Sequence, residues 1–157
     1  MKSIPLSQGK FAVVDDELFD VLNQWIWSYD GTYAVRCGVN GNHILMHDYI
    51  MQPPEGMEVD HVNRYDKLNN CKSNLRICTH SQNMANSRLR VKSASGYRGV
   101  TAHQGRWKAQ IMCMYKNVYV GSFESAIEAA RAYDRKAVEL FGEFAVLNFP
   151  KEVLHES

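Results

Sequence analysis

Residues 58–86, EVDHVNRYDKLNNCKSNLRICTHSQNMAN, hold the side chains best suited to chemistry. Asp60 offers the charged oxygen that Mg²⁺ prefers, and Asn83 could add a neutral amide oxygen. His61, beside Asp60, belongs to a residue type with an ordinary pKa of about 6.5, so it can take a proton from water near neutral pH. Asn74 could hold the intervening loop and orient the imidazole. This set of residues is suited to metal-assisted cleavage of a phosphodiester.

Single pairs of this kind are weak signals, because an adjacent Asp and His more often form a surface pair than a site. The joint pattern is far more specific, and it combines Asp60-His61, Asn69-Asn70, Asn74-Leu75-Arg76 and Asn83-Met84-Ala85-Asn86. His47 is expected to be structural or to contact a phosphate at the periphery. The remaining histidines receive no catalytic role, with His80 the nearest rival as a metal ligand.

The elements that must position these residues follow from the local pattern. Residues 57–62 and 75–78 predict two short strands, and the asparagine-rich stretch 63–73 predicts a polar loop between them. A helix over 81–87, capped by Thr79, should follow. Strand, loop, strand and helix are therefore expected in this order.

Upstream of this segment the sequence predicts small β structure. Residues 10–17 alternate weakly, and 32–39 and 42–51 flank Asn40-Gly41, a dipeptide favoured in tight hairpin turns. Between them, residues 17–29 have the apolar spacing of a short amphipathic helix.

The segment 59–86 resembles the HNH motif of phage-type homing endonucleases, and residues 4–37 and 45–51 resemble the amino-terminal part common in that group. The resemblance implies a ββα-metal nuclease fold with His61 as general base, Asn74 as the residue that braces it, and Asp60 and Asn83 as ligands of Mg²⁺ or Mn²⁺. It also implies a phage-encoded protein that acts in the cytoplasm of a bacterial host.

Charge is strongly segregated along the chain. All 17 acidic residues lie in 1–66 or 124–157, whereas 67–123 contains ten Lys or Arg and no acid, although the net charge is only +1. Such a basic stretch can attract a polyanion while the whole protein stays near neutral. A solvated basic face without a partner is the alternative.

Residues 96–150 predict a second, smaller domain. Three strand-like runs at 97–101, 106–112 and 117–123 precede a helix over 125–141, which Ser125 and Glu128 begin as a capping box and Gly142 ends. We therefore expect a three-stranded antiparallel sheet packed on one helix.

This second segment resembles the AP2 DNA-binding domain through Tyr97-Arg98-Gly99-Val100, Trp107, Gly121-Ser122-Phe123 and Asn148-Phe149-Pro150. The resemblance implies that the sheet enters the major groove of double-stranded DNA. Trp107 could stack on the DNA backbone or fill the core. The residues expected to contact DNA are Arg76, Arg88, Arg90, Lys92, Arg98, Arg106 and Lys108.

The predicted fold class is thus α+β, with a nuclease domain at 1–87, a basic linker at 88–95, the AP2-like domain at 96–150 and a tail at 151–157.

No apolar run is long enough for a membrane span and no signal peptide is recognisable, so we expect an intracellular protein without a membrane partner. The four irregularly spaced cysteines predict reduced thiols. A monomer should nick, whereas a double-strand break would need a dimer or two encounters.

Two alternatives remain open from the sequence. The first is a regulatory or architectural DNA-binding protein whose nuclease motif is inactive. The second is a nuclease directed at RNA, which is weaker because the deep, narrow major groove of RNA does not suit the AP2-like sheet. Competition between duplex DNA and duplex RNA for binding separates the second alternative from the DNA endonuclease.

Overall fold

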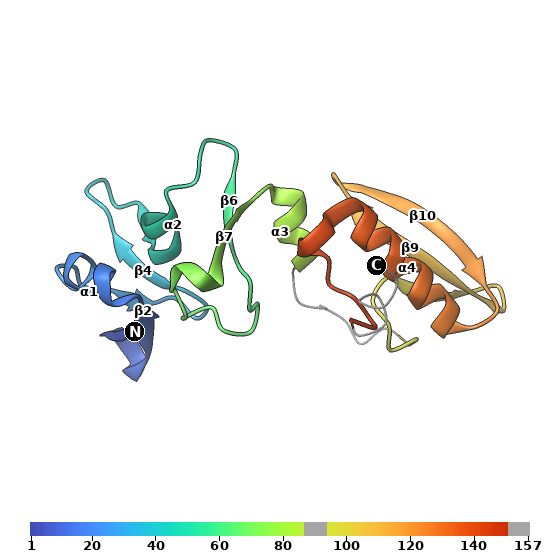
Figure 1. Ribbon diagram of the computed structural model, residues 1–157, viewed down its shortest axis with the longest axis horizontal. Coiled ribbons are helices and arrows are strands. Elements are labelled where there is room, and N and C mark those ends of the chain that lie inside the picture. The colour runs from blue at the N-terminus through green and yellow to red at the C-terminus, as the bar shows by residue number, and fades with distance from the viewer. Residues whose placement is uncertain (87–93, 151–157) are drawn as a thin grey trace. The chain divides into compact units, whose positions relative to one another are not determined.

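A computed structural model describes residues 1–86 and 94–150 of the chain (Figure 1). It divides into two compact units, Met1–His80 and Ser81–Ser157. Residues 87–93 and 151–157 lie outside the described residues, and with them most of the predicted linker, the whole predicted tail and the DNA contacts predicted at Arg88, Arg90 and Lys92. The domain boundary predicted after residue 87 therefore stays a prediction.

The first unit contains three small antiparallel sheets (Figure 1), in the pairings β1–β2, β3–β4–β5 and β6–β7. Its elements are β1 (Lys2–Pro5), η1 (Ser7–Gly9), β2 (Phe11–Val14), α1 (Asp16–Leu22), β3 (Ser28–Tyr29), β4 (Ala34–Cys37), β5 (His43–Leu45), α2 (Met46–Met51), β6 (Glu58–His61), η2 (Lys72–Asn74) and β7 (Leu75–Cys78).

The core of the first unit gathers apolar side chains from its N-terminal two thirds. Ile4, Val14, Leu22, Trp27 and Met46 are almost completely buried within one cluster. Burying each such side chain is worth about 2 kcal/mol, so these contacts stabilise the short strands that would be marginal alone. A backbone hydrogen bond from β2 also ties this strand to the loop after β6, because Val13 N donates to Leu68 O over 2.9 Å.

The helix predicted over 17–29 is shorter than expected. It is α1, which ends at Leu22, and the Trp27 indole Nε1 donates to the Leu22 carbonyl over 2.8 Å at that end. The chain then turns into β3, and Trp25 and Ile26, predicted on the apolar helix face, are exposed. The buried Trp27 thus anchors a turn that apolar spacing alone could not reveal.

The strand predicted over 42–51 is wrong in its second half. Residues 43–45 form β5 and pair with β4 as a hairpin, but Met46–Met51 form helix α2. Met46 is fully buried in the core cluster, whereas Gln52 adopts a left-handed conformation that ends the helix. Gly41 has a positive φ of 75° but Asn40 does not, so the expected tight turn is replaced by a wider loop over 38–42.

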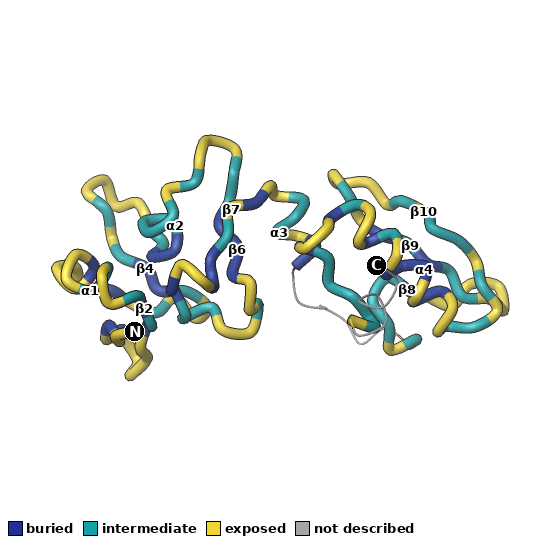
Figure 2. Tube along the Cα trace, viewed as in Figure 1, coloured by how far each residue is buried: buried dark blue, intermediate teal, exposed yellow. Residues whose placement is uncertain are grey.

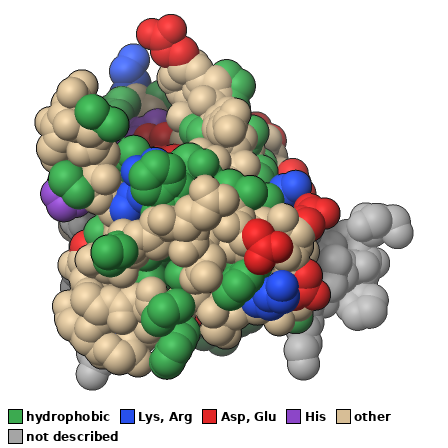
Figure 3. Space-filling view, turned by 90° about the vertical axis from the view of Figure 1, so that its left-hand side faces the viewer, with side chains coloured by type: hydrophobic (Ala, Val, Ile, Leu, Met, Phe, Trp, Pro, Cys, Tyr) green, Lys and Arg blue, Asp and Glu red, His purple; other side chains and the backbone are tan. Residues whose placement is uncertain are grey.

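Several large hydrophobic side chains of the first unit are exposed, including Val21, Trp25, Ile26 and Val39. Figure 3 shows exposed hydrophobic groups on one face of the molecule, interspersed with charged and uncharged ones. Trp25 is partly covered by the Arg36 guanidinium, whose carbon lies 4.2 Å from the ring centroid. Singly scattered apolar groups of this kind are normal on protein surfaces.

The second unit contains the predicted three-stranded antiparallel sheet and its helix (Figure 1). The strands are β8 (Val100–His103), β9 (Arg106–Cys113) and β10 (Lys116–Phe123), with β9 in the centre. Gln104 and Gly105 both have positive φ, as a tight turn between β8 and β9 requires. Ahead of this sheet lies helix α3 (His80–Asn86), which begins at the last residue of the first unit.

Helix α4 (Ala126–Phe141) covers one face of this sheet. Its buried side includes Ala129, Ala130 and Ala137, whose small side chains allow close packing on Ala109 of β9. Ser125 accepts a hydrogen bond from Glu128 N over 3.2 Å, which confirms the predicted cap. The fold is therefore mixed α and β, with several small antiparallel sheets, and no helix among the described residues is long and apolar enough to cross a membrane.

Gly99 illustrates why this sequence requires glycine immediately before β8. Its φ is +71°, and a Cβ built there would lie 2.2 Å from the Tyr133 ring and 2.6 Å from the Gln110 carbonyl oxygen. Tyr133 of α4 therefore packs directly against the backbone at this point, as only glycine permits.

Candidate active site

The predicted catalytic pair lies on the hairpin formed by β6 and β7. Asp60 is the register partner of Arg76, and His61 is the partner of Leu75. Because successive strand residues point to opposite faces, Asp60 and His61 face different surroundings. Figure 2 shows that the residues of this hairpin are largely buried, and both side chains are only 1% exposed.

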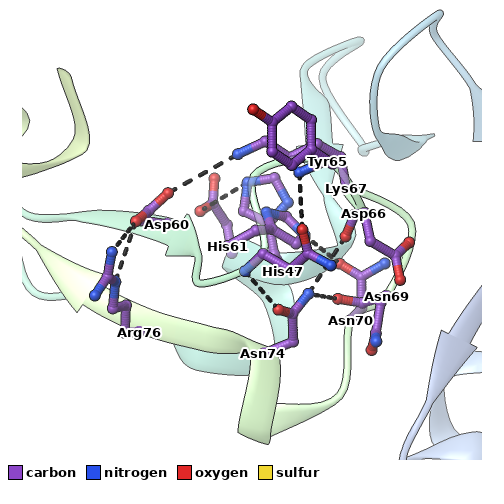
Figure 4. Close-up of polar contacts among 12 residues, drawn as sticks. His47, Asp60, His61, Tyr65, Asp66, Lys67, Asn69, Asn70, Asn74 and Arg76 are labelled. Atoms are coloured by element: carbon purple, nitrogen blue, oxygen red, sulfur yellow. Dashed lines mark hydrogen bonds and ion pairs between the residues drawn. The ribbon is translucent and has the colours of Figure 1, made fainter. Parts of the chain in front are cut away.

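The Asp60 carboxylate is held by two cations (Figure 4). Its Oδ2 accepts hydrogen bonds from Arg76 Nε over 3.1 Å and Nη2 over 2.9 Å, while Lys67 Nζ lies 3.8 Å from Oδ1. Arg76, predicted to contact DNA, therefore orients Asp60 from the neighbouring strand. A carboxylate has lone pairs beyond those that Arg76 uses, so Oδ1 has the chemistry of a ligand for a hard cation.

The His61 ring lies among aromatic rings on the other face of the hairpin. Its centroid is 5.9 Å from that of Tyr33 in a stacked arrangement and 4.9 Å from that of His47, edge to face. Burial lowers the pKa of His61 to about 4, and the nearby Lys67 ammonium adds to this effect, whereas Asn70 and Asp60 oppose it. The imidazole is therefore neutral at pH 7 and has a lone pair to accept a proton.

Asn70 fixes which ring nitrogen carries the proton. Its Nδ2 donates to Leu68 O over 3.2 Å, so its Oδ1 is the atom that faces His61 Nε2, 3.4 Å away. Because an amide oxygen can only accept, Nε2 is the protonated nitrogen in this contact and Nδ1 is the basic one. The contact is long, but Asn70 is completely buried and well placed to select this tautomer.

Asn74 has only part of the role predicted for it. Its Oδ1 accepts from Asn63 N over 2.9 Å, and its Nδ2 donates to the carbonyls of Asn69 and Asp66 (Figure 4). Asn74 thus holds the loop as predicted. Among the described residues its side chain makes no hydrogen bond to His61, because the loop backbone uses its amide and Asn70 takes the position beside the ring.

The other asparagines of the loop explain why this residue type is so frequent here. Asn63 Oδ1 accepts from Tyr65 N over 3.1 Å, and Asn69 Oδ1 accepts from Cys71 N over 3.3 Å. Each bond joins an asparagine to the backbone two residues later, which is how Asn side chains replace backbone turns. The cluster therefore folds a long connection as well as lining a site.

His47, expected from the sequence to be structural or to contact a phosphate, is a further member of the cluster. It comes from α2, is 5% exposed, and packs its ring 5.0 Å from Tyr33 as well as against His61. Burial lowers the pKa of His47 to about 3, with further lowering by His61 and Lys67. Its burial agrees with the structural alternative for His47, whose ring does not lie at the surface. A prediction of the helix at 46–51 would have indicated that the side chain of residue 47 is buried.

Asn83 lies in α3, which belongs to the second unit except for its first residue. Its proximity to Asp60 therefore stays a prediction. Within residues 1–86 and 94–150, no group of three or more His, Cys, Asp or Glu side chains is placed to hold a metal ion. A metal site here would depend on one carboxylate with amide, phosphate and water oxygens, a set that Mg²⁺ accepts.

The arginines predicted to contact DNA from the second unit make contacts within that unit. Arg98 donates to Tyr133 Oη over 3.0 Å and to Ala85 O over 2.9 Å. Arg106 donates to the backbone and side-chain oxygens of Ser122. Lys108 lies on the sheet with its ammonium 5.8 Å from the Tyr119 ring centroid. The neighbouring Trp107 is half-buried and lies on the opposite face of the strand, the face that it shares with Ala109 and that α4 covers.

Comparison with known proteins adds independent findings. The family model for HNH endonucleases matches residues 52–85, which contain Asp60, His61, Asn74 and Asn83. An uncharacterized HNH endonuclease of Acanthamoeba polyphaga mimivirus is 28% identical over 148 residues, which cover 90% of this chain and 76% of that relative. This viral relative extends the likeness through both units.

Plant proteins match a shorter stretch. APETALA2-like protein 2 of rice (Oryza sativa subsp. indica) is 46% identical over 62 residues, or 38% of this chain. An AP2-like ethylene-responsive transcription factor of Arabidopsis thaliana is 47% identical over 72 residues, or 44% of the chain. The chain combines an HNH endonuclease segment with an AP2-like segment. It spans only 14% and 15% of the length of these two plant relatives.

The HNH segment contains the β6–β7 hairpin and its buried Asp60 and His61. HNH nucleases generally depend on a metal ion, which agrees with the oxygen chemistry of Asp60.

Proposed function

We propose that the chain is a metal-dependent DNA endonuclease of the HNH homing type, which nicks DNA at sites selected by its AP2-like segment. The observation that carries the proposal is the HNH hairpin itself, in which a neutral His61 stands next to a carboxylate oriented by Arg76. A proton acceptor and a hard-oxygen ligand on one strand are the two groups that hydrolysis of a phosphodiester requires.

His61 acts as the general base in this proposal. Asn70 keeps the proton on Nε2, so Nδ1 takes the proton from the attacking water. Tyr33 and His47 prevent the ring from turning away. Asp60 and Asn83 would hold Mg²⁺ or Mn²⁺, which when bound stabilises charge on the phosphate and on the departing 3′ oxygen. The products are a 5′-phosphate and a 3′-hydroxyl.

Burial of the pair has a consequence for this mechanism. Asp60 and His61 are each 1% exposed, so the surface must open before a scissile phosphate reaches them. Lys67 is the group to displace from Asp60, because its ammonium lies 3.8 Å from Oδ1 and opposes an incoming cation. Lys67 belongs to the loop between the two strands, where a backbone shift would not disturb the β6–β7 pairing.

The deciding experiment follows conversion of supercoiled plasmid to open circles with Mg²⁺ or Mn²⁺. His61→Ala should reduce the rate about 100-fold or more, because general-base catalysis contributes on this scale. His43→Ala is the matched control, since His43 is an exposed histidine of the same unit. Equal rates for the wild type and His61→Ala would mean that the activity comes from another base or from a contaminant.

A second function has a specific observation in its favour. The salt bridge between buried Asp60 and Arg76 would also be expected in a structural hairpin that has no catalytic role. In that case the chain would be a regulatory or architectural DNA-binding protein. Duplex binding without metal-dependent nicking by the wild type would select this alternative.

A further inference from the structure

The outward face of the AP2-like sheet has a composition that indicates which bases it can recognise. Ala109 and Ile111 of β9 are buried under α4, so the alternate residues point away from the helix. Register pairs extend this face onto the neighbouring strands. The side chains that form its middle are Thr101, Lys108, Gln110, Met112, Asn117 and Tyr119.

This face suits the major groove in shape and charge. Thr101, Met112, Asn117 and Tyr119 are exposed, and residues 100–123 include no acidic side chain. A ribbon of antiparallel strands fits the major groove, where each base pair presents a distinct pattern of donors, acceptors and methyl groups. Lys108 adds a positive charge beside Tyr119.

Two side-chain amides on this face are available for hydrogen bonds. Gln110 lies half-buried on the central strand, opposite Tyr119, and Asn117 lies opposite Met112 on the next strand. Among the described residues neither amide has a hydrogen-bond partner, whereas Arg106, on the same strand as Gln110, donates to Ser122. Gln and Asn form paired hydrogen bonds with adenine N6 and N7, and apolar groups such as those of Met112 and Thr101 suit the thymine methyl.

We propose that this outward face recognises A·T base pairs in the major groove, with Gln110 and Asn117 contacting adenine and Met112 contacting a thymine methyl. The proposal rests on the proposed function, because it assumes that the AP2-like segment selects the DNA site. The proposal specifies the class of DNA sequence that the AP2-like segment selects, namely a site with A·T pairs at its centre rather than the G·C pairs that arginine recognises.

The test uses the full chain with His61→Ala, so that bound DNA stays intact. Duplexes retained from a random pool should be enriched in A·T pairs at neighbouring positions. Gln110→Arg should switch one of these positions to G·C, with a change in relative affinity of about tenfold or more. Gln110→Ala should lose preference at the same position only, and it serves as the second variant if arginine disturbs folding.

Gln24→Arg is the matched control, because it adds the same charge at an exposed position of the other unit. It should leave the selected sequence unchanged. Salt-sensitive duplex binding without A·T enrichment, enrichment in G·C pairs, or a preference unmoved by both Gln110 variants would overturn the A·T proposal and leave the nuclease proposal intact. Failure of the wild type to nick plasmid would overturn the nuclease proposal instead.

Discussion

The two units place their functional groups in opposite ways. In the first unit Asp60 and His61 are buried, and their surroundings come from segments far apart in the sequence, such as Tyr33, His47 and Arg76. In the second unit the outward residues of β9 and β10 are set by strand alternation over one helix. A buried site can shift pKa values and fix a tautomer, whereas an exposed sheet can be altered residue by residue with little effect on folding.

This contrast predicts that the two units lose stability separately. Asp134, buried in α4, accepts from Asn148 N and Phe149 N, each over 2.8 Å. Asp134→Ala should remove both acceptors and lower the free energy of unfolding of the second unit by about 3 kcal/mol. Amide hydrogen exchange would show the loss in β8–β10 and α4, and equal loss of protection in β6 and β7 would contradict independent units.

Acid should destabilise the first unit through its buried histidines. The pKa of His47 is about 3 in the folded chain, against 6.5 for an ordinary histidine, so the folded state binds fewer protons between these values. Stability contributed by neutral His47 is therefore fully present above pH 6.5 and falls as the pH decreases, by roughly 3 kcal/mol at pH 4. The groups that face His47 and modify this effect are His61, Lys67, Asp30 and Asp48.

Urea unfolding of wild type and His47→Phe from pH 4 to pH 7 measures this linkage. Phe keeps an aromatic ring but does not titrate, so the variant should lose less stability on acidification. The same pH slope in both proteins would show that His47 is not the buried neutral group that the geometry indicates.

Asn70 distinguishes tautomer selection from simple loop support. Asn70→Ala removes the acceptor that faces His61 Nε2, so the proton can move to Nδ1 and the nicking rate should fall about tenfold. Asn69→Ala is the matched control, because the Asn69 side chain accepts from Cys71 N and does not contact the imidazole. Equal losses for both variants would assign Asn70 to the loop alone.

The smallest effect is expected at Lys67. Lys67→Met keeps an unbranched side chain but removes the ammonium 3.8 Å from Asp60 Oδ1, so half-maximal nicking should need severalfold less Mg²⁺. Lys72→Met is the control, since Lys72 pairs with exposed Glu17 rather than with Asp60. An increased requirement for Mg²⁺ in Lys67→Met would mean that Lys67 helps to bind the metal–DNA complex.

Local patterns in the sequence predicted much of the fold. The strand predicted at 75–78 is β7 with the same bounds, and the second and third strands and the long helix of the second unit lie within one residue of their predicted bounds. The first strand, predicted at 97–101, is instead β8 at Val100–His103, because residues 97–99 form a turn. Each of these elements depends on contacts within a short stretch of the sequence. The capped, alanine-rich α4 and the alternating strands contain their own boundaries, because turns such as Gln104-Gly105 and the glycine at 142 interrupt the pattern.

Tertiary contacts account for what the sequence did not reveal. Helix α2 forms where Met46 can be buried beside Ile4 and Trp27, and nothing in residues 42–51 indicates those partners. The local sequence also does not indicate that His47 packs against His61, or that Asn70 rather than Asn74 lies beside the imidazole. The motif identified the reactive residues, whereas their supporting contacts depend on the packing of α2 and of the loop.

Metal binding tests the central claim most directly, namely that oxygens from Asp60 and Asn83 hold one cation. Mn²⁺ binding to the full chain, followed by electron paramagnetic resonance, should show one site that Asp60→Asn and Asn83→Ala each weaken strongly. Because both ligands would serve the same ion, the double variant should bind little worse than the weaker single variant. Asn42→Ala, at an exposed asparagine, should bind as the wild type does. Unchanged Mn²⁺ affinity in Asn83→Ala, or losses that simply add in the double variant, would contradict a shared site.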